Sequence, residues 1–323
     1  MHFASTVKRA PSGCRTVGPM REVTHSFYVR AVIAATKAIR EGLDDALDLA
    51  ALGKKAALSP LHFHHVFRGL TGETPLGMHR RLRLERAAYK LATTDVPVTV
   101  LAYEAGYETH ESFTRAFRSA YDASPTDHRR RAKSARKSGR RGPPLELTAR
   151  TGVHFGDPTP VVTLPKLRGG GDVTIEALPR MVVATVHHRG PYPTIFEAFG
   201  RLGAIAGPAG LFTSRSKMIA LYHDDPEAVS PSELRSDAGI TVDSRTKLPS
   251  ALGRVVLPKG RYARTTHRGP YERLGDTWSR LMGAWLPASE HRVRKGPSFE
   301  IYRNDPETTK PNDRLTDVYV PIR

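Results

Sequence analysis

The chain has 323 residues, of which 39% are hydrophobic and 25% charged, so it is long enough for two domains and can bury a core in each. No stretch approaches 18 consecutive apolar residues, which excludes a membrane-spanning helix, and the first twenty residues lack the apolar run of a secretory signal. A single cysteine, Cys14, can form neither an intramolecular disulfide nor a cysteine zinc site, which fits a reducing cytoplasm.

The positive charge is unevenly distributed. The chain carries 50 Lys and Arg against 32 Asp and Glu, a net charge of +18. Residues 1–150 hold 26 basic and 14 acidic residues, so +12 of that surplus lies in the first half. Such a footprint favours a polyanionic partner, nucleic acid above all, over a basic protein whose charge serves solubility alone.

Residues 25–131 are predicted to be helical throughout, after a flexible arm at 1–24. Three polar residues stand where they can cap predicted helices: Asp48, Ser59 and Thr109. A long helix follows Thr74-Pro75 and ends before Pro97, because proline disfavours helical geometry in the residue that precedes it. The pattern is a short helix, a tight turn and a capped helix, repeated on either side of the long helix.

Residues 132–171 differ sharply in composition. A run of Lys and Arg up to Arg141 is followed by Pro143-Pro144 and later by Gly169-Gly170-Gly171. This composition buries no core and predicts a basic linker. Its charges are either simply solvated or add nonspecific phosphate contacts.

Residues 172–323 contain an internal repeat. The run His188-Arg189-Gly190-Pro191-Tyr192 returns 79 residues later as His267-Arg268-Gly269-Pro270-Tyr271. Each copy stands between a predicted strand and a helical pattern. Two equivalent α/β units at a constant offset predict a pseudo-twofold α+β domain with a ligand groove where its halves meet.

The second helix-turn-helix copy carries a recognisable motif. It reads Ala105-Gly106-Tyr107-x-Thr109-x-x-Ser112-Phe113-x-Arg115-x-Phe117-x-x-x-Tyr121-x-x-Ser124-Pro125-x-x-x-Arg129. Residues 25–131 therefore resemble the AraC/XylS family of bacterial transcription regulators. The resemblance implies a double helix-turn-helix module that reads two adjacent major grooves of double-stranded DNA, with RNA polymerase as a further partner.

The outward faces of the two capped helices are the candidate DNA-reading surfaces. In the second copy they comprise His110, Glu111, Thr114 and Arg115, and in the first copy Leu61, His64 and His65. Ala57 replaces the glycine that the family usually has in the first turn. Four arginines of the long helix are interpreted as surface or phosphate-contacting residues: Arg80, Arg81, Arg83 and Arg86. No Cys or carboxylate has ligand spacing beside the histidines, so no metal is expected.

Residues 172–323 resemble the GyrI-like effector-binding domain. The resemblance rests on the His-Arg-Gly-Pro-Tyr repeats and on Phe299-Glu300-Ile301-Tyr302-x-Asn304-Asp305-Pro306. It implies two pseudo-symmetric β-α-β-β repeats of the GyrI-like/SHS2 type, with a cleft for small, often cationic or amphipathic molecules. An AraC-type module fused to such a domain resembles the Rob group of regulators.

Glu300 is the leading candidate for ligand binding. It lies between Phe299 and Ile301 in an apolar strand, where a carboxylate is costly unless it meets a cation, a hydrogen-bond donor or water. Alternation along a strand places Tyr302 on the same face. Four further aromatics could line a groove for a cation: Tyr192, Tyr271, Trp278 and Trp285. The alternatives are that Glu300 only pairs with an arginine and that Trp278 belongs to the core.

These features predict a DNA-binding transcription regulator whose C-terminal domain senses a small-molecule effector, with no cofactor and no catalytic residue. Two alternatives stay open. The C-terminal domain could hydrolyse electrophilic small molecules, with Glu300 as general base and Tyr302 as donor. The chain could also bind DNA without responding to any ligand.

Overall fold

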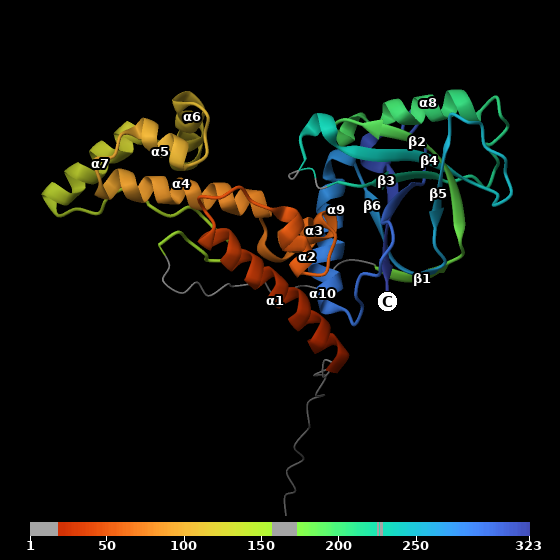
Figure 1. Ribbon diagram of the computed structural model, residues 1–323, viewed down its shortest axis with the longest axis horizontal. Coiled ribbons are helices and arrows are strands. Elements are labelled where there is room, and N and C mark those ends of the chain that lie inside the picture. The colour runs from red at the N-terminus through yellow and green to blue at the C-terminus, as the bar shows by residue number, and fades with distance from the viewer. Residues whose placement is uncertain (1–18, 157–172, 225, 227–228) are drawn as a thin grey trace, which may run out of the picture.

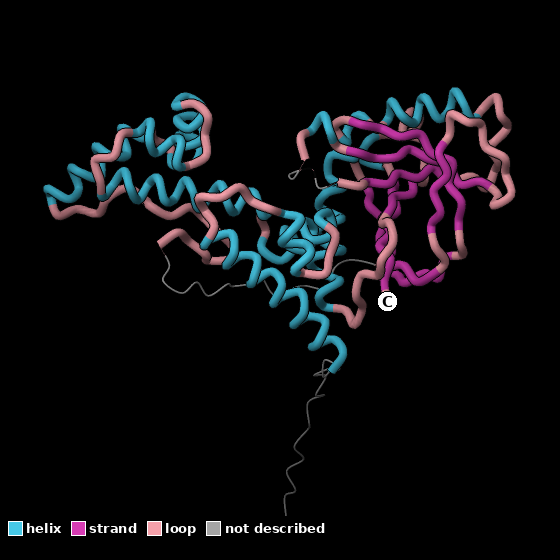
Figure 2. Tube along the Cα trace, in the orientation of Figure 1, coloured by secondary structure: helices cyan, strands magenta, loops and turns pink. Residues whose placement is uncertain are grey.

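The computed structural model describes residues 19–156, 173–224, 226 and 229–323. It consists of an all-helical N-terminal part and a C-terminal antiparallel sheet flanked by helices, as the sequence predicts (Figure 1). Among the described residues, strands occur only in the C-terminal part (Figure 2). Residues 1–18 and 157–172, which include most of the predicted arm and the end of the predicted linker, lie outside the described residues. The prediction of a flexible arm is wrong for residues 19–24, because they form the first turns of a helix that begins at Pro19. No helix within the described ranges is long and apolar enough to cross a membrane.

The N-terminal part has helices at the three predicted caps and at further positions. They are α1 (Pro19–Glu41), α2 (Leu49–Lys55), α3 (Pro60–Thr71), α4 (Pro75–Thr93), α5 (Val98–Glu104), α6 (His110–Tyr121) and α7 (Pro125–Ser138). The side chains of Asp48, Ser59 and Thr109 accept backbone N–H groups in the first turns of α2, α3 and α6. These bonds satisfy N–H groups that have no partner within the helix.

The arginines of α4 hold the helices together, so their interpretation as surface or phosphate-contacting residues is wrong for three of the four. Arg83 donates to the carbonyl oxygen of Leu43 at 2.6 Å. Arg86 bridges Asp44 and the carbonyl oxygen of Glu104 at the end of α5. Arg81 is buried and binds two carboxylates of its own domain. Arg80 is exposed, as expected.

The segment after α7 returns along α4. The carboxylate of Glu85 on α4 accepts a hydrogen bond from Arg81 and the backbone N–H groups of Leu147 and Phe155. Val153 is completely buried in the same segment. The expectation that residues 132–171 bury no core is therefore wrong for the part before residue 157, because a buried carboxylate organises that part of the chain.

The C-terminal part forms one antiparallel sheet with the order β1-β6-β8-β7-β3-β4-β2-β5. Its strands are β1 (Thr174–Leu178), β2 (Met181–Arg189), β3 (Met218–Tyr222), β4 (Arg235–Val242), β5 (Gly253–Leu257), β6 (Gly260–Arg268), β7 (Phe299–Tyr302) and β8 (Leu315–Ile322). Its helices are α8 (Phe196–Ala206), α9 (Leu274–Arg280), the π-helical turn η4 (Leu281–Trp285) and α10 (Leu286–Ala288). Strands β3 and β7 pair at the centre, where Ala220 lies opposite Glu300.

The turn between α2 and α3 contains strained backbone at Ala57. Its φ of 53° lies in the left-handed region, and its side chain is exposed. A side chain costs about 1–2 kcal/mol in this conformation, whereas glycine adopts it freely but loses more entropy on folding.

We expect Ala57→Gly to raise the free energy of unfolding by about 0.5–1 kcal/mol, measured as a higher Tm. Ala56→Gly is the matched control, because Ala56 has a φ of −83° and is buried. That control should lower the Tm. If both substitutions lowered the Tm, strain at Ala57 would be contradicted.

Candidate nucleic-acid interface and effector site

Helix α6 presents the predicted reading face to solvent. Phe113 and Phe117 are completely buried and hold the helix against its domain. On the opposite side His110, Glu111 and Arg115 are exposed, and Thr114 is half-buried. The structure thus brings the candidate residues of the second copy together on one accessible surface, far from the C-terminal domain (Figure 1). Their contact with DNA stays a prediction.

Helix α3 has no comparable exposed face in this conformation. His64 and His65 retain 4% and 9% of their exposure, His62 is buried as well, and Leu61 is half-buried. The expectation of an exposed reading face is therefore wrong here. The physical reason is that α9 and η4 of the C-terminal part pack against α3.

The contact between α3 and the C-terminal part includes a ring stack, a hydrogen bond and an ion pair. The imidazole of His65 stacks on the indole of Trp278, with ring centroids 5.2 Å apart and planes at 12°. His62 Nε2 is hydrogen-bonded to Ser298 Oγ at 2.7 Å. At the edge of the contact Arg68 forms an ion pair with Asp276, with 3.3 Å between nitrogen and oxygen.

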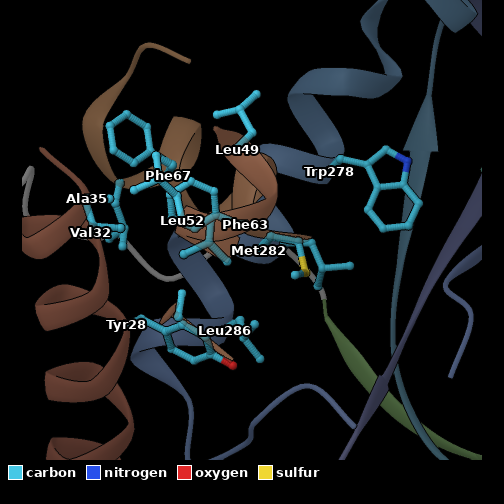
Figure 3. Close-up of a cluster of buried hydrophobic side chains, with 14 of the residues drawn as sticks. Tyr28, Val32, Ala35, Leu49, Leu52, Phe63, Phe67, Trp278, Met282 and Leu286 are labelled. Atoms are coloured by element: carbon cyan, nitrogen blue, oxygen red, sulfur yellow. The ribbon is translucent and has the colours of Figure 1, made fainter. Parts of the chain in front are cut away.

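The two parts also share one hydrophobic core. Side chains from α1, α2 and α3 converge with Met282 and Leu286 of the C-terminal part (Figure 3). The hydroxyl oxygen of Tyr28 on α1 accepts the backbone N–H of Val293 at 3.2 Å. Apolar area buried in this way holds the domains in a defined arrangement.

Glu300 lies on β7, is 2% exposed and is surrounded by aromatic donors. Trp278 Nε1–H donates to Oε1 at 2.7 Å, and the hydroxyls of Tyr222 and Tyr302 donate to Oε2 at 3.2 and 3.1 Å. These three side chains, rather than an arginine, satisfy the buried carboxylate. Tyr222 was not among the predicted site residues, although it precedes Tyr302 by 80 residues, close to the interval of the internal repeat.

Further aromatic rings enclose this group. Tyr271 lies edge-on to Tyr302 at 5.4 Å, and Tyr192 lies edge-on to Tyr222 at 4.7 Å. Trp285 is not part of the enclosure, because it stacks on His291 and packs into the shared core. On an uninterrupted α-helix Trp285 would share a face with Trp278, seven residues earlier. The π-helical turn between them turns it away.

Burial raises the pKa of the Glu300 carboxyl, and the hydrogen bonds from Trp278, Tyr302 and Tyr222 offset only part of that effect. A cation placed beside Glu300 would favour its charged form. Both oxygens of Glu300 already accept hydrogen bonds from neighbouring side chains. A cavity of about 390 Å³ lies at the domain boundary, lined by Ser59, His62 and Lys295 among others.

We expect acid to weaken the contact between α3 and the C-terminal part. Burial lowers the pKa of His62 to about 4. Burial, with the nearby charges of His64, His62 and Arg68, holds the pKa of His65 well below 6.5. Both rings are neutral in the contact and would take up a proton once exposed, so the contact is at full strength above about pH 6.5 and weakens as pH falls toward 4.

Below pH 6.5, each such histidine would lower the free energy that stabilises the contact by about 1.4 kcal/mol per pH unit. The groups that face the two rings are Ser298, Trp278, His64 and the Arg68–Asp276 pair. The Tm should therefore fall between pH 7.5 and 5.5, and by less in a His62→Gln, His65→Gln double variant. An equal fall in both proteins would contradict this origin of the pH dependence.

Comparison with known proteins covers both parts of the chain. Residues 52–131 match the model of a helix-turn-helix domain, and residues 171–323 match the GyrI-like small molecule binding domain. The regulatory protein SoxS of Escherichia coli (strain K12) is 34% identical over 109 residues, which span 34% of this chain and 99% of SoxS. A DNA gyrase inhibitor of Edwardsiella ictaluri is 32% identical over 157 residues, which span 47% of this chain and 96% of that protein.

Among solved structures, the crystal structure of the EcmrR C-terminal domain aligns with 47% of this chain and 97% of its own, at 18% identity and a TM-score of 0.42. Two separate matches thus account for the helical part and for the sheet domain. The chain belongs to the AraC-type DNA-binding transcription regulators and carries a GyrI-like effector domain at its C-terminal end.

Proposed function

We propose that this regulator reads duplex DNA with α3 and α6 and that a small cationic or amphipathic molecule, bound at Glu300, sets its activity. The observation that carries the proposal is the accessible face of α6, which presents Arg115 and its neighbours on a helix anchored by buried phenylalanines. RNA polymerase is the further partner proposed for a regulator of this family.

The length of the helix that joins the two helix-turn-helix units supports the proposal. Helix α4 joins the two helix-turn-helix units and has 19 residues, so it spans about 28 Å at the usual rise per residue. Successive major grooves on one face of B-DNA are about 34 Å apart. Beside α6, helix α7 exposes basic residues that suit phosphate contacts: Arg130, Arg131, Lys133, Arg136 and Lys137.

The surroundings of Glu300 support a cationic effector. A carboxylate enclosed by aromatic faces attracts a cation both by charge and through the rings. Strands β3 and β7 pair at the centre of the sheet, one from each sequence repeat, so Glu300 lies beside the boundary of the two proposed pseudo-symmetric halves. Because both oxygens of Glu300 already accept hydrogen bonds, an effector that contacts the carboxylate has to displace Tyr222, Tyr302 or Trp278 from it.

A second candidate is hydrolysis of electrophilic small molecules at the same site. The hydroxyls of Tyr222 and Tyr302 both reach Oε2 of Glu300, which is an arrangement of a base with two donors. Turnover of an electrophilic substrate that Glu300→Gln abolishes would favour this function. Unchanged DNA binding and Tm with every small molecule tried would favour a regulator that acts without a ligand.

We expect Arg115→Ala to weaken binding to a selected duplex by about 1–3 kcal/mol if the guanidinium reads a base. The duplex is obtained by selection from a random library with the full chain, and binding is measured by fluorescence anisotropy. Arg118→Ala is the control, since Arg118 is exposed near the other end of α6. Its loss should be smaller and equal for selected and unrelated sequences. Unchanged affinity and unchanged sequence preference in Arg115→Ala would contradict its assignment.

We expect Glu300→Gln to weaken binding of tetraphenylphosphonium, an aromatic cation, by at least about tenfold, because the substitution removes the charge. Glutamine keeps an oxygen that can accept the Trp278 N–H, so DNA affinity without the cation should not change. Isothermal titration calorimetry measures the first effect. Glu307→Gln makes the same change at an exposed position and is the control. Equal cation affinity in all three proteins would remove Glu300 from the site.

A further inference from the structure

Trp278 touches both of the surfaces to which function has been assigned. Its indole N–H donates to Glu300 Oε1 at 2.7 Å, inside the proposed effector site. Its ring stacks on His65 of α3, at the proposed DNA-reading face. One side chain of the C-terminal domain thus joins the carboxylate to the covered helix.

We propose that the C-terminal domain masks α3 from DNA and that Trp278 couples this mask to the effector site, so that occupation of Glu300 releases α3. The coupling half of the proposal rests on the proposed effector site. The other half, that the C-terminal domain covers α3 and keeps DNA from it, depends only on the contact between the domains.

The mask follows from the depth at which α3 is buried. A helix reads base edges only when its outward side chains enter the major groove. Here the ring of His65 stacks on Trp278 of α9, His64 beside it is 4% exposed, and both α9 and η4 pack against α3. A Cβ added at Gly69 would lie 2.3 Å from Gly283 Cα, so α3 and η4 meet backbone to backbone and leave no room for a duplex.

The coupling follows from competition for one carboxylate oxygen. A cation that reaches Glu300 takes the place beside Oε1 that the indole N–H of Trp278 holds, so it displaces that N–H from the oxygen even when it has no hydrogen to donate. An indole N–H that loses its acceptor in a buried site is destabilised there. The indole then favours a position that restores a partner, and the stack on His65 is lost with that movement.

The helix that carries Trp278 contains an element suited to such a shift. The π-helical turn η4 follows α9 directly and includes Gly283, whose backbone lies against Gly69 of α3. A π-helical turn holds one more residue per hydrogen-bonded turn than an α-helix and is rare, which is consistent with a functional role. Return of η4 to α-helical geometry would change the face that it presents to α3.

The shared hydrophobic core keeps the mask closed in the absence of an effector. Opening α3 exposes apolar surface that both domains bury. An effector can shift this equilibrium only if it binds the open arrangement more tightly than the closed one. In the closed arrangement the carboxylate of Glu300 is hydrogen-bonded to Trp278, Tyr222 and Tyr302. A ligand therefore contacts the carboxylate only when some of these bonds are broken.

The mask is tested with Gly283→Ala in the full chain. The added methyl would lie 2.1 Å from Gly69 Cα and cannot be accommodated without separating α3 from η4. Gly203→Ala on α8 is the control, because open space surrounds its added methyl. We expect Gly283→Ala to bind the selected duplex at least about tenfold more tightly without effector, and Gly203→Ala to bind as wild type.

Equal affinity of Gly283→Ala and Gly203→Ala would overturn the mask. If Gly283→Ala fails to fold, Asp276→Arg replaces it, since this half-exposed residue pairs with Arg68 across the contact and the substitution makes the pair repulsive. It should tighten binding of the selected duplex more than binding of an unrelated duplex, because the added positive charge alone strengthens both. An equal change for the two duplexes would count against the mask.

The coupling is tested with Trp278→Phe, which keeps an aromatic ring against His65 but has no N–H to donate. We expect wild type to bind the duplex more tightly when tetraphenylphosphonium is present. Trp278→Phe should still bind the cation through Glu300, yet its DNA affinity should no longer change with the cation. Tyr319→Phe removes a donor to a different carboxylate, that of Glu176, and lies outside both the shared core and the Glu300 group, so it should respond as wild type.

A response of Trp278→Phe equal to that of wild type would overturn the coupling, as would a wild type that binds the cation without any change in DNA affinity. A wild type that does not bind the cation would overturn the proposed effector site together with the Trp278 link. The comparison of Gly283→Ala with Gly203→Ala would still decide the mask.

Discussion

Backbone contact between Gly69 and Gly283 is the constraint on which the arrangement of the two domains depends. Neither position has room for a Cβ, so any other residue would hold α3 and η4 apart. Only at this distance can the ring of His65 stack on Trp278 and can His62 reach Ser298. The same approach closes the core that α1, α2 and α3 share with the C-terminal helices. The absence of a Cβ at these two glycines thus allows the C-terminal part to cover α3, while α6 stays exposed to solvent.

Burial of the Glu300 carboxylate costs hydration free energy, and the surrounding hydrogen-bond donors offset only part of that cost. A carboxylate buried among aromatic rings loses its hydration, and three hydrogen bonds replace that hydration incompletely, which is why its pKa is raised. An apolar residue in the same strand would avoid this cost. A buried acidic group with a perturbed pKa is typical of a functional site. In the proposed coupling, the poorly solvated carboxylate of Glu300 is connected to α3 through Trp278 and so serves regulation.

The N-terminal part is built so that one reading helix is independent of the domain contact. Helix α6 is anchored by Phe113 and Phe117 in a core that excludes the C-terminal domain. Helix α3 instead contributes to the core shared by both domains. The two helix-turn-helix units therefore differ in physical environment although they repeat one sequence pattern. In this arrangement only the second unit is ready to meet DNA.

The sequence by itself determined the features that depend on neighbours along the chain. Ser59 and Thr109 predicted helix starts because capping is a bond between residues three apart. Alternation along the strand placed Glu300 and Tyr302 together. The two equivalent α/β units expected from the 79-residue repeat stay a prediction. Only the tertiary structure decided that α3 is covered, that Tyr222 joins Glu300, and that Glu85 binds the segment after α7. Those contacts join residues far apart in the chain, and neither periodicity nor spacing specifies which distant surfaces meet.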